Sequence, residues 1–188
     1  MKIIIASNNQ GKIKEFKELL GDKYEIYSMR EVGLYDDIEE NGTTFLQNAT
    51  IKAEYVYKKT GITVIADDSG LCVDSLNGEP GVYSARYAGE NATMEENKKL
   101  LLKNLQGKDR KAYFTTCLVM LGDKKIVAYG KTEGEILFKE EGTNGFGYDG
   151  LFYSYDLKKS FGVALEQEKN MVSHRSRAIK NLIEQLNK

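Results

Sequence analysis

The stretch "VIADDSGLCVD", Val64–Asp74, combines an apolar run with two adjacent carboxylates. Its apolar residues, Val64–Ala66, are typical of a buried strand, and we expect Asp67 and Asp68 at the end of that strand. Neighbouring acids in such a place repel each other, and a fold tolerates them more easily where a cation or a proton is bound. This stretch therefore predicts a central strand that carries a functional site.

Magnesium is the cation that such a site suits best. Mg²⁺ prefers hard oxygen ligands, and one or two carboxylates plus substrate phosphates commonly complete its shell. Because adjacent residues of a strand point to opposite faces, we expect only one of the two acids to contact the metal and the other to face inward. The alternative interpretation is that both acids only cap the turn at "DSG".

The composition is that of an ordinary globular protein. The 188 residues are 41% hydrophobic and 29% charged, which predicts one domain over residues 1–188 or two small lobes. A formal net charge of −1 gives no reason to expect a nucleic-acid or membrane partner.

The opening "MKIIIAS" is too short for a signal peptide, and no apolar run reaches transmembrane length. Cys72 and Cys117 lie in apolar surroundings without a Cys-x-x-Cys pair, so we expect reduced core thiols. Together these features predict a cytoplasmic protein.

Strand-like and helical segments alternate in the first half of the chain, and two long strand-like segments follow. Apolar runs predict strands at residues 2–6, 24–29, 62–66, 111–121 and 124–137, the last two joined through "GDKK" as a hairpin. Helical spacing predicts helices at about 12–20, 44–59, 93–105 and 174–186. A long loop is expected at 75–91. The pattern predicts an α/β fold with a mixed, twisted central sheet and flanking helices.

The stretch "IASNNQGKIKE" predicts an anion site near the N-terminus. A strand, a tight polar loop and a helix start leave free helical N–H groups facing the loop. Ser7 and Asn9 add side-chain donors, and Lys12 adds a positive charge. The spacing is not that of a Walker A loop. A capped helix with a solvated lysine remains the alternative.

The helix expected from about residue 44 carries a polar face. Phe45, Asn48 and Lys52 lie at positions i, i+3 and i+7, which indicates a polar cleft with Lys52 directed at a phosphate. Glu39 and Glu40 precede this helix and could meet the acid pair around a divalent ion. A solvated acidic loop is the alternative for the two glutamates.

Two further motifs suit the recognition of a base. In "NGFGYDGLF", Phe146 lies between glycines and can stack on a base, and Asp149 can accept a base N–H. In "EKNMVSHRSR", His174 and Arg175 follow the expected N-cap Ser173. Cations at the start of a helix oppose its dipole, so these two side chains are expected to donate to an acceptor on a ligand. A turn with core aromatics and a structural histidine are the alternatives.

Together these motifs resemble the inosine triphosphate pyrophosphatase family, hydrolases of non-standard purine nucleoside triphosphates. The resemblance covers nearly the whole chain, through motifs in the family's order: "SNNQGK", "FLQNATIKA", "ADDSGL", "PGVYSARYAG", "GFGYD", "EKN" and "SHR". It implies a Mg²⁺-dependent enzyme that hydrolyses the α–β phosphoanhydride of ITP, dITP and XTP, giving the monophosphate and pyrophosphate and keeping these nucleotides out of DNA and RNA. It also implies a homodimer and an α/β fold with two lobes around a nucleotide-binding cleft.

The resemblance assigns a role to each matching residue. The triphosphate would be bound by Ser7, Asn8, Asn9, Gln10, Gly11, Lys12 and Lys52. Glu39 and Asp68 would bind Mg²⁺, Asp68 would also accept the proton of the attacking water, and Ser69 would contact the substrate. The purine would be held by Phe146, Gly147, Tyr148, Asp149, Lys169, His174 and Arg175.

Some positions depart from the family pattern. Gly150 stands where a proline commonly follows "GYD", and Val163 stands where a glutamate is common. "EEN" replaces the commoner "EET", so Glu39 is preferred over Glu40 as a metal ligand only modestly. Two other functions stay open: pyrophosphohydrolysis of a pyrimidine or methylated nucleotide, and non-catalytic nucleotide binding, which the intact acids and lysines disfavour.

Overall fold

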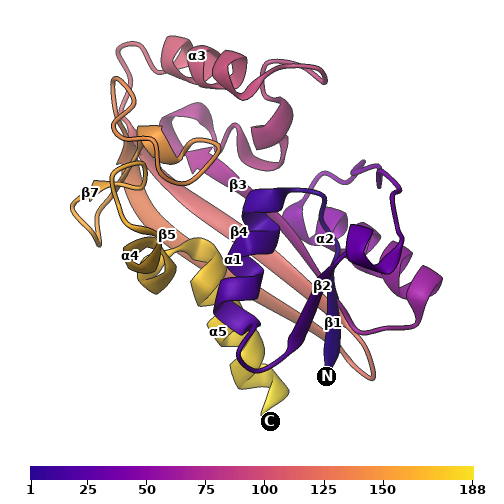
Figure 1. Cartoon of the computed structure of the whole chain (residues 1–188). Helices are drawn as coiled ribbons and strands as arrows, with labels where there is room; N and C mark the ends of the chain where they lie inside the picture. The colour runs from indigo at the N-terminus through magenta and orange to yellow at the C-terminus, as the bar shows by residue number, and fades with distance from the viewer. The chain divides into compact units, whose positions relative to one another are not determined.

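The computed structural model describes residues 1–188 and contains a single mixed sheet (Figure 1). The strand order is β2-β1-β3-β4-β5-β6-β7. The strands are β1 (Lys2–Ile5), β2 (Glu25–Ser28), β3 (Val64–Val73), β4 (Lys111–Leu121), β5 (Lys125–Ile136), β6 (Phe152–Ser154) and β7 (Lys159–Ser160). β1 is parallel to β2 and β3, whereas β6 is antiparallel to β5 and β7. The predicted α/β fold with a mixed sheet is confirmed.

The helices are α1 (Gln10–Leu20), α2 (Phe45–Thr60), α3 (Met94–Asn104), α4 (Glu166–Val172) and α5 (His174–Leu186). α2 and α3 begin at capping boxes, in which Thr44 or Thr93 accepts from the backbone of the residue three positions on. The sequence missed the short elements α4, β6 and β7. The loop predicted at 75–91 contains a 3₁₀ helix at Gly81–Arg86.

The chain divides into two compact units. Unit 1 comprises residues 1–68, 116–130 and 176–188, and unit 2 comprises residues 69–115 and 131–175. The boundaries therefore fall inside β3, β4, β5 and the first turn of α5 (His174–Leu186).

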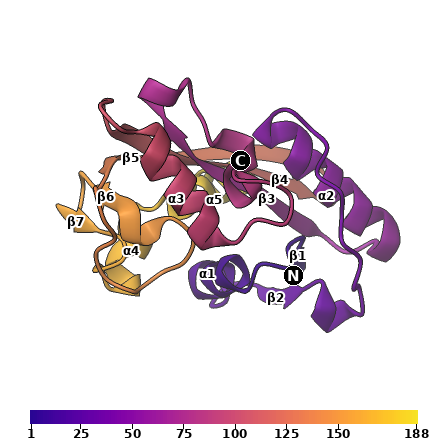
Figure 2. The ribbon, with the colours of Figure 1, turned by 90° about the horizontal axis from the view of Figure 1, so that it is seen from above.

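Helices cover both faces of the strands in unit 1 (Figures 1 and 2). Ile3 and Ile5 of β1 belong to a buried cluster with Phe16 of α1 and Leu182 of α5. Ile4, which points to the opposite face, belongs to a second cluster with residues of α2. The strand alternation of side chains thus produces the layered arrangement of this unit.

Aromatic side chains form the core of unit 2. The ring centroids of Phe114 and Phe152 are 4.6 Å apart, and those of Phe152 and Phe161 are 5.1 Å apart. Leu101 of α3 is fully buried in the same cluster. This core supports the segments that carry the predicted base-binding residues.

The expected position of the acid pair on its strand is wrong. Asp67 and Asp68 lie in the interior of β3, which continues to Val73, and not at its end. The strand continues because Leu71 and Val73 are also apolar and are buried in the core of unit 2. The prediction ended the strand at the first polar residues, although buried partners satisfy them.

Candidate active site

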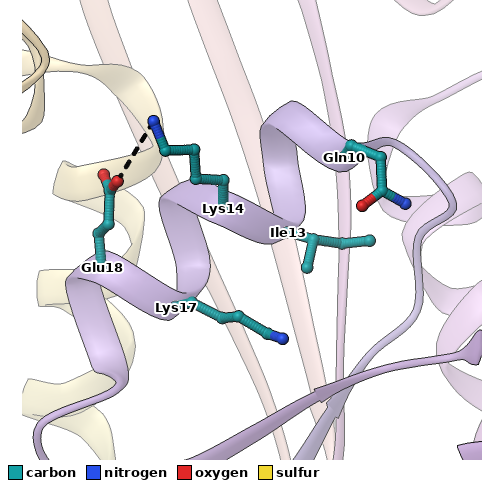
Figure 3. A pocket seen from close by; sticks show the side chains of 5 residues that line it. All are labelled: Gln10, Ile13, Lys14, Lys17 and Glu18. Carbon is teal, nitrogen blue, oxygen red and sulfur yellow. Dashed lines mark ion pairs between the residues drawn. The ribbon is translucent and has the colours of Figure 1, made fainter. Parts of the chain in front are cut away.

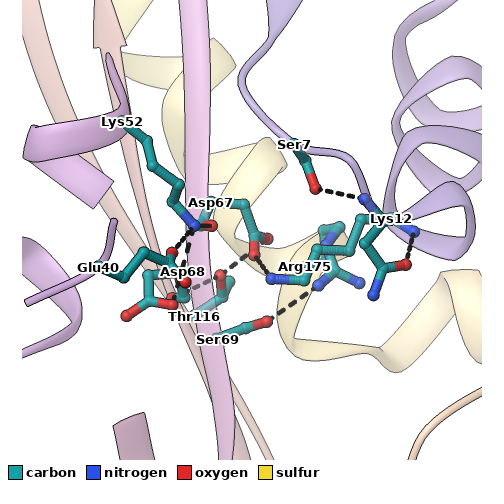
Figure 4. A network of polar contacts seen from close by, with 10 residues as sticks. Ser7, Lys12, Glu40, Lys52, Asp67, Asp68, Ser69, Thr116 and Arg175 are labelled. Carbon is teal, nitrogen blue, oxygen red and sulfur yellow. Dashed lines mark hydrogen bonds and ion pairs between the residues drawn. The ribbon is translucent and has the colours of Figure 1, made fainter. Parts of the chain in front are cut away.

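The two adjacent acids of β3 occupy different environments. Asp67 is completely buried, and Asp68 is only 6% exposed. Asp67 contacts Lys12 of α1, whereas Asp68 lies near Lys52 of α2 (Figure 4). Since α1 and α2 cover opposite faces of the unit 1 strands, the alternation predicted for the two carboxylates is confirmed.

Asp67 is held by two side-chain donors from distant parts of unit 1. Lys12 Nζ donates to its Oδ1 at 2.6 Å, and Thr116 Oγ1 of β4 donates to its Oδ2 at 3.0 Å. These contacts stabilise the buried carboxylate, so Asp67 is the inward-facing support that the sequence predicts. Thr116 had no signal in the sequence, because its role depends on the pairing of β4 with β3.

Lys52 connects the second acid to the acidic segment before α2. Its Nζ donates to the carbonyl oxygen of Asp67 at 2.7 Å, forms an ion pair with Glu40, and lies 3.9 Å from Asp68 Oδ1. Glu39 is exposed and forms no hydrogen bond or ion pair through its side chain. The structure thus places Glu40 beside Lys52, and the modest preference for Glu39 receives no geometric support.

Burial dominates the electrostatics of Asp68. It raises the pKa of this carboxyl from 3.8 to about 6, although the charges of Lys52 and Lys12 oppose the shift. Glu40 adds to it through like-charge repulsion. A carboxyl with a pKa near 6 is suited to accept and release a proton close to neutral pH.

The polar atoms around Asp68 fit a hard divalent cation. Asp68 Oδ2 is buried and has no hydrogen-bond partner, and the same is true of Asn48 Nδ2 on α2. Glu40 and Asp68 are both carboxylates, and two carboxylates are a common protein contribution to a Mg²⁺ shell. The residues present therefore fit the metal that the sequence predicts.

The polar loop before α1 caps the helix. Asn9 accepts from the backbone N–H of Lys12 at 3.1 Å, and Ser7 Oγ accepts from the N–H of Asn9 at 3.1 Å. Asn8 Nδ2 donates to the carbonyl of Asp36 at 3.3 Å. The loop thus caps α1, a feature that the anion-site and capped-helix interpretations share, and Lys12 is not a solvated lysine because it contacts Asp67. Gln10 and Gly11 form the first turn of α1.

Within unit 2, a buried ion pair lies beside the glycine-rich segment. Asp149 Oδ2 accepts from Lys169 Nζ at 2.8 Å and from the backbone N–H of Phe146 at 3.0 Å. Lys169 Nζ also lies 4.7 Å from the centroid of the Phe146 ring. Gly145 and Gly147, on either side of Phe146, have φ angles of +73° and +62°, which favour glycine. The half-buried Phe146 ring is therefore held between the glycines that the sequence singled out.

The remaining predicted base-site residues are buried in unit 2. His174 stacks on Phe114 with 5.0 Å between ring centroids, and Arg175 Nη2 lies 3.2 Å from Ser69 Oγ, to which it donates. The Tyr148 hydroxyl donates to the carbonyl of Ser84 at 2.6 Å. The side chain of Tyr148 thus has a structural role in anchoring the segment, and only its backbone remains for a ligand.

Two of the three departures from the family pattern, Gly150 and Val163, lie in unit 2. A Cβ atom on the buried Gly150 would approach Glu140 Oε1 to 2.9 Å, and Glu140 pairs with Lys98 at 2.7 Å. Val163 is 48% exposed and interacts with Ser160 through its backbone N–H. A residue larger than glycine at position 150 would therefore need the space that Glu140 and its partner Lys98 occupy.

Fold and site together define an α/β protein with paired acids and lysines suited to a phosphorylated, metal-bound ligand. The chain belongs to the Ham1 family, whose family model matches residues 3–185. It is 50% identical over 187 residues to a dITP/XTP pyrophosphatase of Thermoanaerobacter pseudethanolicus, covering 97% of this chain and 94% of that protein. The family predicted from the motifs is confirmed.

Solved structures agree with this assignment. The Ham1 protein of Staphylococcus aureus matches with a TM-score of 0.87 and 45% identity, covering 100% of this chain and 98% of that one. A HAM1 protein of Coxiella burnetii matches with a TM-score of 0.88 and 39% identity, over the same shares of the two chains. No helix of this protein is long and apolar enough to span a membrane.

Proposed function

We propose that this protein is a Mg²⁺-dependent nucleoside-triphosphate pyrophosphatase that converts ITP, dITP and XTP to the monophosphate and pyrophosphate. The name of the Thermoanaerobacter relative, dITP/XTP pyrophosphatase, supports the substrate class. The observation that carries the proposal is Asp68, a buried carboxylate with a pKa near 6 and an unpaired Oδ2, close to Lys52. A protein that only binds nucleotides has no need of an acid that activates water.

The reaction needs a water molecule aligned with the leaving pyrophosphate. The water oxygen bonds to the α-phosphorus, its proton passes to Asp68, and the bond from that phosphorus to the bridging oxygen breaks, so that pyrophosphate leaves with the electron pair. Lys12 and Lys52 bring two positive charges beside Asp67 and Asp68, where the phosphate oxygens would lie. Their charges stabilise the transition state.

Glu40 and Asp68 are the residues that would hold Mg²⁺. The ion supplies positive charge for the phosphate oxygens when it is bound. Glu40 replaces Glu39 in this proposal because Glu40 pairs with Lys52, which also lies near Asp68. The polar loop Ser7–Gly11 contributes the N–H groups at the start of α1 to the triphosphate.

Base selection follows from hydrogen-bond complementarity. Hypoxanthine and xanthine present an acceptor at O6, to which His174 and Arg175 donate. Phe146 stacks on the ring of the base, and Asp149 and Lys169 supply the remaining polar contacts with it. Adenine presents an amino group at that position and would leave buried donors unpaired. This accounts for the rejection of ATP, whereas rejection of GTP needs a steric or donor mismatch at the 2-amino group.

The remaining expectations concern the protein as a whole. Residues 1–188 work as one pyrophosphatase domain in the cytoplasm, where the two unpaired thiols stay reduced. The protein acts as a homodimer, and the segment that contains Tyr83, whose side chain is 48% exposed, is the proposed interface.

Phosphorus NMR of the purified protein with Mg²⁺ tests the proposed reaction. Separate samples contain ITP, XTP, GTP, ATP or dUTP, and Asp68→Asn is measured beside the wild type. We expect fast release of pyrophosphate from ITP and XTP, and slow or no release from the other three. We expect Asp68→Asn to lose at least about 10³-fold in turnover while it still binds ITP.

The products separate the alternatives. Orthophosphate with a diphosphate product would mean cleavage at the γ-phosphate and would refute the proposed phosphate geometry. Fast cleavage of dUTP alone would mean a pyrimidine substrate. Intact ITP binding without any product would favour a regulatory nucleotide-binding protein, and wild-type turnover by Asp68→Asn would refute the assigned base.

A further inference from the structure

A cationic groove lies at the C-terminal end of α3, within unit 2 and outside all residues assigned above. Its volume is about 630 Å³, and its polar lining includes Lys99, Lys103, Lys108 and Arg110. Leu102 and Leu105 supply apolar surface, Phe138 completes the wall, and no aspartate or glutamate lines the groove. A chain with a net charge of −1 has no general excess of cations, so this concentration is local.

The lysines of this groove have few acidic partners. Lys99 interacts with Glu95 and Glu96 of the preceding turn, which do not line the groove, whereas no ion pair holds Lys103 or Lys108. Lys99 and Lys103 are like charges at i and i+4 on α3, an arrangement that destabilises a helix. The hollow along α1 in Figure 3 is different, because Lys14 Nζ lies 3.7 Å from Glu18 and Lys17 Nζ lies 2.8 Å from Glu31. A bound polyanion would relieve the repulsion in the α3 groove.

The helix dipole accounts for only part of this pattern. Cations near a helix C-terminus are favourable, and Lys103 in the last turn of α3 satisfies that rule. α2 ends in the same way with Lys58 and Lys59. Neither of these two lysines lines the α3 groove, and α2 therefore offers a matched control for charge alone.

Phe138 adds an aromatic platform to the groove. Its side chain is 83% exposed, and the Arg110 guanidinium lies 4.1 Å from its ring centroid. Arg110 is fixed because it donates to the carbonyl oxygens of Ile136 and Leu137 at 2.5 and 2.6 Å. The nearest carboxylate acting on Arg110 is Glu135, which is outside the lining. An exposed aromatic ring beside a fixed guanidinium and lysines is an arrangement on which nucleobases stack.

We propose that this groove is a second nucleotide site, which binds a phosphorylated nucleoside with its base on Phe138 and its phosphates on Lys99, Lys103 and Lys108. The volume lies within the range of small-molecule sites. Three lysines in a groove without a lining carboxylate suit the negative charge of a nucleoside diphosphate or triphosphate. The same chemistry is offered by a free nucleotide and by a single-stranded nucleic acid, and the experiment distinguishes these two sources.

Amide chemical shifts of the ¹⁵N-labelled full-length protein test the groove. The titrations use ADP, inorganic pyrophosphate and a 12-nucleotide oligodeoxyadenylate, at low salt and with EDTA so that metal-dependent binding is suppressed. We expect ADP to shift the amides of residues 99–110 and 138 with a Kd below about 1 mM. Lys103→Glu/Lys108→Glu is expected to weaken ADP binding at least about 10-fold, and Lys58→Glu/Lys59→Glu, with the same charge change, is expected to leave it unchanged.

Phe138→Ala separates base stacking from charge. This exposed position tolerates alanine without loss of a core contact, and we expect about 10-fold weaker ADP binding with unchanged pyrophosphate binding. If the oligonucleotide binds more strongly than ADP and loses this binding in Lys103→Glu/Lys108→Glu, the site exists and its ligand is a single-stranded nucleic acid. If ADP binds and the oligonucleotide does not, the site exists and its ligand is a free nucleotide.

Three results would overturn the proposal. The first is the absence of shifts at residues 99–110 with all three probes at low salt. The second is equal weakening by the α2 control pair, which would mean general electrostatic attraction. If Phe138→Ala leaves ADP binding unchanged, the aromatic platform is not used and the groove is not a nucleotide site. The spectrum of each variant also reports whether it is folded.

Discussion

At the scale of single residues, burial and partner choice separate two chemically identical side chains. Asp67 is completely buried and accepts from Lys12 and Thr116, so its charge is matched within the fold. Asp68 has an oxygen with no partner and a pKa raised to about 6, chiefly by burial. A supporting acid and a reactive acid can thus lie next to each other in one strand.

The choice between Glu39 and Glu40 is testable with one pair of substitutions. Glu40→Gln removes the carboxylate that pairs with Lys52, and we expect the Mg²⁺ concentration for half-maximal activity to rise at least about 10-fold. Glu39→Gln alters an exposed side chain and is expected to behave like the wild type. Activity is measured against Mg²⁺ concentration at saturating ITP.

The reverse order of the two variants would restore Glu39 as the ligand. Equal metal dependence in both would mean that Asp68 and the substrate phosphates hold the ion without either glutamate.

At the scale of elements, a polar contact links α1 with the segment after β2. Glu31 accepts from Lys17 Nζ at 2.8 Å and from the backbone N–H of Ser28 at 2.7 Å. These hydrogen bonds, that of Lys17 first, lower the pKa of Glu31 from 4.5 to about 2. The charged form is therefore favoured by folding.

This contact predicts a pH-dependent contribution to stability. Because the pKa of Glu31 is lower in the folded state, its contribution is complete above pH 4.5 and is lost as the pH falls towards 2. The side chain is 45% exposed and screened by solvent, so we expect Glu31→Gln to destabilise by no more than about 1 kcal/mol at pH 7. Urea unfolding of both proteins at pH 7, 5 and 3.5 gives the difference.

Glu18→Gln is the matched control on α1. Glu18 forms an i, i+4 pair with Lys14 at 3.7 Å, for which a few tenths of a kcal/mol is the ordinary value. A Glu31→Gln difference that stays constant down to pH 3.5 would contradict the role assigned to the Glu31 charge.

At the scale of the whole molecule, each compact unit has its own core and its own cysteine. Cys117 is completely buried in unit 1, and Cys72 is 4% exposed in unit 2. Burial raises the pKa of Cys117 to about 11 and also raises that of Cys72. The predicted reduced core thiols are present as free, buried cysteines.

These thiols predict the chemical behaviour of the folded protein. Since the thiolate is the reactive form and both groups are buried, we expect neither cysteine to react with Ellman's reagent until the protein unfolds. The single-thiol variants Cys72→Ala and Cys117→Ala assign any reaction to one unit. Labelling of native protein as fast as that of urea-unfolded protein would contradict the burial of that thiol.

Much of the fold could be predicted because its signals are local. α5 coincides with the predicted helix, and α2 begins one residue after the start predicted at about Thr44. The strand Lys111–Leu121 was predicted with its observed bounds. The two-residue strand β7 and the short helix α4 were missed because so few residues carry little periodicity.

The sequence by itself determined the order of helices and strands and the kinds of side chain that each motif contains. Helix caps, periodicity and residue chemistry act over a few positions, so a local pattern records them. Only the tertiary structure decided which groups meet. Lys12 reaches Asp67 from 55 positions away, Thr116 from 49, and Lys169 reaches Asp149 from 20. Contacts over such separations arise from strand pairing and helix packing, which no local pattern records.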